Sequence, residues 1–434
     1  MKYKNLENKL FVKNRADFSK HLKNNSLAIL NSNDEFPRSG DQNFPFKQNC
    51  DLFYLSGIDQ EKTVLLLYPD CPNSLYREVL FLRQTNEHIK VWEGHKYTKS
   101  MAELASGIKK VCWLEDFDNI LHSIISYADH IYLNTNENDS TPYTVADRDI
   151  RFIEQMKSKY PLHHYERAAP ILRQLRQTKS EEEVALIQKA CDITRDAFIR
   201  VLKFTRPQVT EYEIEAEIIH EFIRQQATGH AYPPIIASGN NANILHYGDN
   251  NQICKENELI LMDFGAEYAN YNADLSRTIP VSGRFTPRQK SVYQSVQYVM
   301  DEAKKLMKPG ISGSDYNENV GELMTGQLVG LGLLSMEEVK NQNPAHPAYK
   351  KYFMHGISHH LGLDVHDFAH RYTPFQAGNV LTCEPGIYIP AEGFGIRLEN
   401  NILITADGNI DLMAHIPIHA EEIETIMNSS TYSH

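Results

Sequence analysis

The feature that most constrains the fold is the stretch ELILMDFGAEYANYNADLSRTIPVSGRF at residues 258–285. An apolar run ends in Asp263, a segment rich in Tyr, Asn and Ala follows, and a second strand-like run begins at Asp274. This pattern predicts a β-hairpin. Asp263 and Asp274 can then face each other across the strand pair, where opposed Cβ atoms lie about 4.5–5.5 Å apart. Carboxylates that close repel each other unless a cation or a shared proton intervenes.

Two further carboxylates lie in apolar, strand-like sequence nearer the C-terminus. They are Glu384 in VLTCEPGIYI and Glu399 in GFGIRLENNILIT. Burying an unpaired carboxylate is costly, so each needs a partner. Residues two apart on a strand share a face, so we expect Arg397 and Glu399 to be neighbours.

The stretch MHGISHHLGLDVHD at residues 354–367 contains four histidines, His355, His359, His360 and His366. A zincin site would need HExxH on a helix, but Gly356 follows the first histidine here. His359 and His360 are adjacent and would point to opposite faces of a strand, so only one of them can face the carboxylates.

Four carboxylates and one imidazole form a donor set that suits hard or borderline divalent ions such as Mn²⁺, Co²⁺ or Zn²⁺. Two such ions balance four carboxylate charges, and bridging carboxylates hold them about 3.5–4 Å apart. Each residue alone is more often a turn, edge or core residue. Together, in apolar strand context, they indicate a metal site.

Composition narrows the class of protein. The chain has 434 residues and a net charge of −12, which predicts two or three domains and argues against a nucleic-acid binder. We expect no signal peptide and no membrane span, because no apolar run approaches about 18 residues. Six scattered cysteines without a CxxC pair predict free thiols and a cytoplasmic protein.

The chain divides into two parts by pattern. Residues 1 to about 165 alternate strand and helix signals: 63–70 and 78–84 are expected to be neighbouring strands, and 114–128 a helix. This predicts an α/β domain with Trp92 and Trp113 in its core. Capping boxes at 180–183 and 210–213 then predict two helices, followed by strands and a helical block at about 287–341. The boundary is expected at 165–175.

These stretches resemble the pita-bread metallopeptidases, specifically the aminopeptidase P (Xaa-Pro aminopeptidase) family. The matching segments are ILHY around His246, the 258–285 hairpin, MHGISHHLGLDVHD, LTCEPGIYI and GIRLENNILIT, and FPRSGDQNFPFKQNCDLFYLSGID resembles the start of the family's non-catalytic domain. The resemblance implies an α/β (α+β) protein. An N-terminal mixed α/β domain (1–170) would precede a pita-bread catalytic domain (171–434).

The resemblance also implies a role for each site residue. Two divalent ions per subunit, with Mn²⁺ expected ahead of Co²⁺ or Zn²⁺, would be bound by Asp263, Asp274, His359, Glu384 and Glu399, of which Asp274 and Glu399 bridge. His246, His355 and His366 would bind the substrate, with His246 and His366 also catalytic, and Arg397 would orient the bridging group.

The implied reaction is hydrolysis of the bond between an N-terminal residue and a following proline. Metal ions lower the pKa of a bridging water, and Glu384 acts as the general base that passes the proton to the leaving nitrogen. A metal and His366 stabilise the oxyanion. The expected partners are peptides with proline at the second position, and the family often forms homodimers or tetramers.

Several relatives are alternatives. Prolidase shares the ligand set but cleaves only dipeptides, and the 36–59 segment favours aminopeptidase P. The N-terminal domain argues against a methionine aminopeptidase. Creatinase and the non-catalytic pita-bread binding modules have lost metal ligands, whereas all five are present here.

Overall fold

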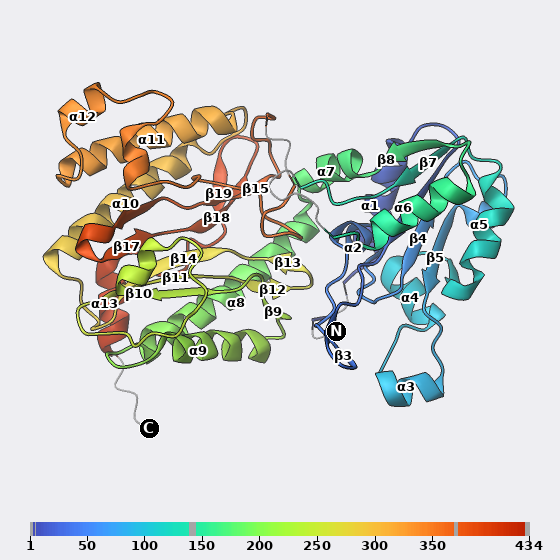
Figure 1. The fold of residues 1–434 in the computed structure, drawn as a ribbon, viewed down its shortest axis with the longest axis horizontal. Helices are drawn as coiled ribbons and strands as arrows, with labels where there is room; N and C mark the ends of the chain where they lie inside the picture. Colours follow the sequence, from blue (N-terminus) through green and yellow to red (C-terminus); the bar gives the residue numbers. More distant parts are fainter. Residues whose placement is uncertain (1–2, 5, 139–144, 369–371, 430–434) are drawn as a thin grey trace. The chain divides into compact units, whose positions relative to one another are not determined.

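The computed structural model describes residues 3–4, 6–138, 145–368 and 372–429. They form two compact units, Tyr3–Arg176 and Gln177–His434 (Figure 1). The division falls within helix α7 (Ala169–Gln177). Among the described residues, no helix combines the length and apolar character needed to cross a membrane.

The N-terminal unit is built on a six-stranded mixed sheet in the order β6-β5-β4-β1-β7-β8. The two apolar runs predicted to be neighbouring strands are β4 and β5, which pair antiparallel as expected. Almost every residue of the central strands is buried, because helices cover the sheet. The strands are β1 (Ser26–Asn31), β2 (Pro37–Ser39), β3 (Gln42–Asn43), β4 (Val64–Leu67), β5 (Glu78–Leu82), β6 (Lys110–Trp113), β7 (His130–Leu133) and β8 (His164–Arg167).

The helices of this unit surround the sheet in Figure 1. The predicted helix at 114–128 is a 3₁₀ turn followed by α5. The helices are α1 (Lys9–Lys20), α2 (Cys50–Ser56), η1 (Ser74–Tyr76), α3 (Glu87–Glu93), α4 (Lys99–Ser106), η2 (Leu114–Asp116), α5 (Phe117–Ile125) and α6 (Arg148–Lys159).

The core position predicted for Trp92 is wrong. Trp92 lies on α3, which has no buried residue, and its side chain is 77% exposed. Trp113 at the end of β6 is half-buried, with Lys99 Nζ 4.7 Å from the centroid of its ring.

The C-terminal unit places its sheets between α8 and α9 on one side and α10 and α11 on the other (Figure 1). Both predicted capping boxes are present, with Ser180 and Glu183 beginning α8 and Thr210 and Glu213 beginning α9. The predicted helical block consists of three helices. The helices are α8 (Glu181–Phe204), α9 (Glu211–Arg224), η3 (Gly239–Asn243), α10 (Pro287–Leu306), α11 (Gly313–Gly330), α12 (Met336–Lys340), η4 (Ala348–Lys351), η5 (Pro390–Glu392) and α13 (Ala420–Ser429).

The strands of this unit form the three-stranded sheets β10-β11-β14, β13-β12-β9 and β15-β18-β19 and the pair β16-β17. The predicted hairpin is confirmed: β11 pairs antiparallel with β14, and β12 with β13. The strands are β9 (Gly229–His230), β10 (Ile235–Ser238), β11 (Leu259–Phe264), β12 (Ala266–Tyr268), β13 (Tyr271–Asn272), β14 (Leu275–Pro280), β15 (Val380–Cys383), β16 (Gly386–Ile389), β17 (Phe394–Arg397), β18 (Asn400–Ile404) and β19 (Asn409–Asp411).

Arg277 on β14 ties the hairpin to the end of the chain. Its side chain is fully buried. Its guanidinium donates to the backbone oxygens of Ser276, Glu399 and Pro417 at 2.8–3.0 Å and to Oδ1 of Asn400 at 2.8 Å. A buried guanidinium needs such acceptors, because each buried N–H donor left without an acceptor costs on the order of 1–3 kcal/mol.

Candidate metal centre

The hairpin brings Asp263 and Asp274 to one face, but not directly opposite each other. Its turn is centred on Ala269 and Asn270, which both have positive φ (51° and 67°), as a two-residue type I′ turn requires. Asp263 therefore pairs with Ser276. The predicted direct opposition of the two aspartates is wrong: Asp274 lies two residues before Ser276, the partner of Asp263, so the aspartates are diagonal neighbours on the shared face.

Tyr232 joins the two aspartates. Its hydroxyl lies 2.6 Å from Asp263 Oδ1 and is also hydrogen-bonded to Asp274 Oδ1. One phenol proton can serve only one oxygen at a time, so this contact does not remove the repulsion between two carboxylates. Burial raises the pKa of Asp263, although the nearby Arg397 opposes the shift.

Arg397 at the end of β17 pairs with Asp263, with Nη2 to Oδ2 at 2.5 Å. Its Nε donates to Ser276 Oγ at 2.7 Å, and that hydroxyl donates to Glu399 Oε2 at 2.8 Å. Arg397 thus reaches Glu399 through Ser276, whereas the sequence predicted adjacent side chains. The reason is that β17 ends at Arg397, so strand alternation does not continue to Glu399.

His359 completes a cluster with Asp274 and Glu399, in which one ligand-type atom from each residue lies within 4.8 Å of the others. His359 Nε2 is 3.4 Å from Asp274 Oδ2 and 3.7 Å from Glu384 Oε1. Its Nδ1 lies 3.0 Å from the backbone oxygen of His360, which assigns a proton to Nδ1 and leaves Nε2 facing the carboxylates. Burial lowers the pKa of His359, but the carboxylates outweigh it and raise that pKa to about 9.

Glu384 follows β15, and its carboxylate lies between two histidines. Oε1 is 3.7 Å from His359 Nε2, and Oε2 is 3.7 Å from His355 Nδ1. Thr382 Oγ1 donates to Oε1 at 3.3 Å. Burial raises the pKa of Glu384 to about 7 and that of Glu399 well above its ordinary value.

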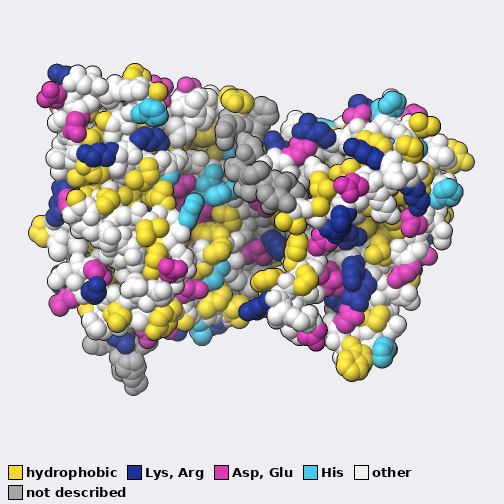
Figure 2. All heavy atoms as spheres, viewed as in Figure 1, with side chains coloured by type: hydrophobic (Ala, Val, Ile, Leu, Met, Phe, Trp, Pro, Cys, Tyr) yellow, Lys and Arg dark blue, Asp and Glu magenta, His cyan; other side chains and the backbone are white. Residues whose placement is uncertain are grey.

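Three other histidines lie around this cluster. The ring of His366 packs edge-on against His359, with 4.4 Å between centroids. His355 Nε2 is 2.8 Å from Tyr388 Oη, and burial lowers the pKa of His355 to about 3. His246 is exposed, and its charge helps to lower the pKa of both His355 and His366. Figure 2 shows histidine and acidic side chains gathered on this face of the unit.

His360 turns away from the cluster, as predicted from its adjacency to His359. It is buried beside Lys179 and Asp367, its Nδ1 has no hydrogen-bond partner among the described residues, and burial lowers its pKa to about 3. Lys179 Nζ and Asp367 Oδ2 form an ion pair of 3.0 Å in which each side chain is 1% exposed. A Cβ at Gly362 would come within 2.2 Å of Asp367 Oδ2, so a glycine is needed there.

Sequence reasoning missed the residues that hydrogen-bond to the predicted site residues and hold them in place. Tyr232, Ser276 and Tyr388 each bond to a predicted site residue, and Tyr388 Oη accepts from Arg397 Nη1 at 2.8 Å. Asn401 exchanges two hydrogen bonds with the backbone of Asp274. Only Ser276 could have been found from the sequence, by placing the turn at the residues able to adopt positive φ and counting back to Asp263.

The arrangement suits a cation. Four carboxylates converge at this site. Among the arginines and lysines that the structure describes, Arg397 alone forms an ion pair with one of them. Buried acids with raised pKa values are costly to ionise, and a bound divalent ion removes that cost. Oxygen donors with one imidazole nitrogen are the ligands of hard or borderline metals.

Comparison with known proteins adds independent information. A family model described as metallopeptidase family M24 matches residues 185–406, and one described as the aminopeptidase P N-terminal domain matches residues 11–132. The Xaa-Pro aminopeptidase of Escherichia coli is 32% identical, covering 96% of this chain and 97% of its own length.

Solved structures agree over nearly the whole chain. A putative aminopeptidase P from Bacillus anthracis has a TM-score of 0.91 and 32% identity, covering 99% of this chain and 100% of its own. Zn-substituted aminopeptidase P from E. coli, in complex with product, has a TM-score of 0.88 and 31% identity, with 98% and 99% covered.

Proposed function

The chain belongs to metallopeptidase family M24, in the aminopeptidase P family, and on that premise we propose that it removes an N-terminal residue from peptides with proline at the second position. The observation that carries the proposal is the convergence of Asp274, His359 and Glu399 within 4.8 Å, flanked by Asp263 and Glu384. The residues that the resemblance singled out are thus neighbours in space.

Asp263, Asp274, His359, Glu384 and Glu399 are the residues that would hold two divalent ions. Metal ions in such a site supply Lewis acidity and a nucleophilic water at neutral pH. We propose Mn²⁺ as the native ion, with Co²⁺ and Zn²⁺ as alternatives that the same donors accept.

The protein's own groups supply positioning and proton transfer. Glu384 takes a proton from the attacking water and delivers it to the prolyl nitrogen, a role that suits a carboxylate between His359 and His355. His366 donates to the oxyanion, and its contact with His359 supports a position beside the reacting carbonyl. His246 binds the substrate from the exposed side.

His355 and Arg397 are proposed to act together through Tyr388, because both bond to its hydroxyl. In this arrangement Arg397 holds Asp263, and thereby one metal ligand, in a fixed orientation. His355 is held neutral by burial and is proposed to border the pocket for the proline ring. That pocket must be apolar, because the prolyl nitrogen has no N–H to bond.

The test is a substrate panel with added Mn²⁺: Arg-Pro-Pro and other Xaa-Pro-Yaa tripeptides against Xaa-Pro dipeptides. Release of the first residue from tripeptides supports the proposal. Cleavage confined to dipeptides would instead identify a prolidase. If protein shown to bind metal cleaves neither the tripeptides nor the dipeptides with any of the three metals, the chain would instead be identified as a non-catalytic binding module.

We also propose that residues 1–170 are a non-catalytic domain and residues 171–434 the catalytic one. A cytoplasmic location is proposed because all six cysteines are free and five are buried. The proposed homodimer or homotetramer rests on the resemblance alone, and light scattering of the purified chain tests it.

A further inference from the structure

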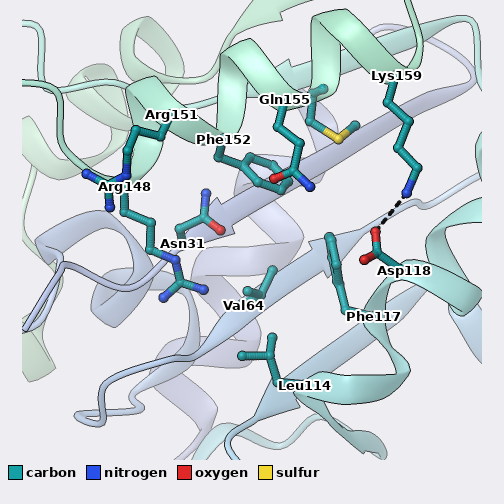
Figure 3. A pocket seen from close by; sticks show the side chains of 11 residues that line it. Asn31, Val64, Leu114, Phe117, Asp118, Arg148, Arg151, Phe152, Gln155 and Lys159 are labelled. Carbon is teal, nitrogen blue, oxygen red and sulfur yellow. Dashed lines mark hydrogen bonds and ion pairs between the residues drawn. The ribbon is translucent and has the colours of Figure 1, made fainter.

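The N-terminal unit has a pocket of its own, far in sequence from the residues of the metal centre. Its volume is about 330 Å³, at the lower end of the range for small-molecule sites. Helix α6 forms one wall, and η2, α5 and the strands β1 and β4 supply the rest (Figure 3). The proposed peptidase reaction uses none of these residues.

One side of the pocket is apolar. Phe117 and Phe152 face each other with their ring centroids 6.0 Å apart and their planes inclined by 55°. Val64 and Leu114 lie beneath them in Figure 3. These side chains form a surface for a flat or branched apolar group, which gains about 25 cal/mol for each Å² that it removes from water.

Two of the three cationic side chains that line the pocket have an ion-pair partner, and the third has none among the residues that the structure describes. Lys159 Nζ pairs with Asp118 Oδ1 at 2.9 Å, and Arg151 Nη2 pairs with Asp34 Oδ1 at 2.6 Å. Arg148, by contrast, forms no ion pair within the described residues. Its only hydrogen bond there is donated by Nη1 to the hydroxyl of Ser32.

Arg148 is also in an environment that makes its charge costly. Burial lowers its pKa, and Asp149 and Asp34 offset that effect only from beyond ion-pair distance. In Figure 3 its guanidinium reaches toward Val64 and Leu114, whereas that of Arg151 turns to the other side. A partly desolvated guanidinium with free donors is a recognition element for a carboxylate, which it can bind through two parallel hydrogen bonds.

A second unsatisfied group lies in the same lining. Asn31 is 2% exposed, and its Nδ2 donates to Asp149 Oδ1 at 2.9 Å. Its Oδ1 is buried without a hydrogen-bond donor in the described part of the chain. Buried acceptors are normally paired, so this oxygen is the acceptor that a ligand N–H would satisfy once the Asn31 amide turns toward the pocket.

We propose that this pocket binds an apolar amino acid through its free carboxylate, in the form of an N-acylated residue or the C-terminal residue of a short peptide. The carboxylate pairs with Arg148, the adjacent amide N–H donates to Asn31 Oδ1, and the side chain packs on Phe117 and Phe152. The carboxylate thus meets a guanidinium that has no ion-pair partner, and the amide N–H meets an acceptor that has no donor, among the described residues.

The experiment compares N-acetyl-L-phenylalanine with N-acetyl-L-phenylalaninamide on the full-length metal-loaded protein, by calorimetry or ligand-observed NMR. The two probes differ only at the C-terminal group, which is a charged carboxylate in one and a neutral carboxamide of the same shape in the other. Neither has a free amino terminus or a proline, so neither resembles a substrate of the proposed peptidase. We expect the acid to bind about tenfold more tightly or better, the value of a charge-assisted hydrogen bond.

Variants then assign the difference to one residue. Arg148→Met keeps the aliphatic stem and should remove the preference for the acid, whereas Arg148→Lys should retain part of it because the charge remains. Arg151→Met is the matched control and should change the affinity less than threefold, since Arg151 already has a carboxylate partner. Equal binding of acid and amide to the wild-type protein, no saturable binding of the acid, or an unchanged preference in Arg148→Met would each overturn the proposal.

Discussion

Replacing Lys179 by Met should destabilise the C-terminal unit more than any surface substitution. The change keeps most of the apolar stem but removes the cation that faces Asp367 at 3.0 Å. Both side chains are 1% exposed, so water cannot take the place of the lysine without a rearrangement.

The magnitude follows from the geometry. At an effective dielectric constant of about 20, two unit charges about 3 Å apart attract each other by roughly 5 kcal/mol. Losing one partner of a buried pair typically costs about 3–5 kcal/mol, because the remaining charge is left uncompensated. We therefore expect Lys179→Met to lower the free energy of unfolding by about 3–5 kcal/mol at pH 7.

Urea denaturation of the full chain, followed by circular dichroism, measures this loss. Lys203→Met on the exposed face of α8 is the control and should stay within about 0.5 kcal/mol of wild type. The double variant Lys179→Met/Asp367→Asn should recover most of the stability, because it also removes the buried carboxylate charge that faced the lost cation. A loss below about 1 kcal/mol for Lys179→Met, or a double variant no more stable than the single one, would refute the reasoning.

Three further outcomes test other parts of the structure. Tyr232→Phe removes the hydroxyl that contacts both aspartates and should weaken Mn²⁺ binding by about 10–100-fold in a calorimetric titration; unchanged affinity would show that the hydroxyl does not orient the ligands. Glu384→Ala should abolish peptide turnover, whereas His360→Ala should leave kcat nearly unchanged, and an inactive His360 variant would contradict its position away from the cluster. Burial raises the pKa of Asp149 to about 7, so the folded state holds more protons than the unfolded state between pH 4 and 7. The stability of wild type relative to Asp149→Asn should accordingly fall by about 1.4 kcal/mol for each pH unit as the pH rises through that window, and parallel stability curves for the two proteins would be evidence against the shift.

The parts of the fold that the sequence predicts well are those set by local patterns. The capping boxes at Ser180 and Thr210 mark helix starts because the same side chains that signal them satisfy the free N–H groups of the first turn. Strands β4 and β5 follow from two apolar runs separated by a turn. The hairpin at 258–285 has the same origin.

What the sequence does not reveal depends on non-local geometry. The offset between Asp263 and Asp274 depends on where the turn is centred, and a shift of one residue changes every cross-strand partner. Tyr232 and Tyr388 carry no local signal, because tyrosine is common both in the core and on the surface. Trp92 was expected in the core, whereas its burial depends on whether another element covers α3, and α3 has no buried residue.

The four contacts of Arg277 also bear on how the chain is synthesised. The first strand of the hairpin, with Asp263, emerges from the ribosome long before Glu384 and Glu399, and the acceptor at Pro417 comes later still. Until then, the guanidinium that later becomes fully buried has no complete set of acceptors. The hairpin therefore completes its native hydrogen bonding only after Pro417 has been synthesised, and the five proposed metal ligands are all present only once Glu399 has been added. Truncation before Pro417 should consequently destabilise the C-terminal unit, because the buried Nε of Arg277 loses its acceptor.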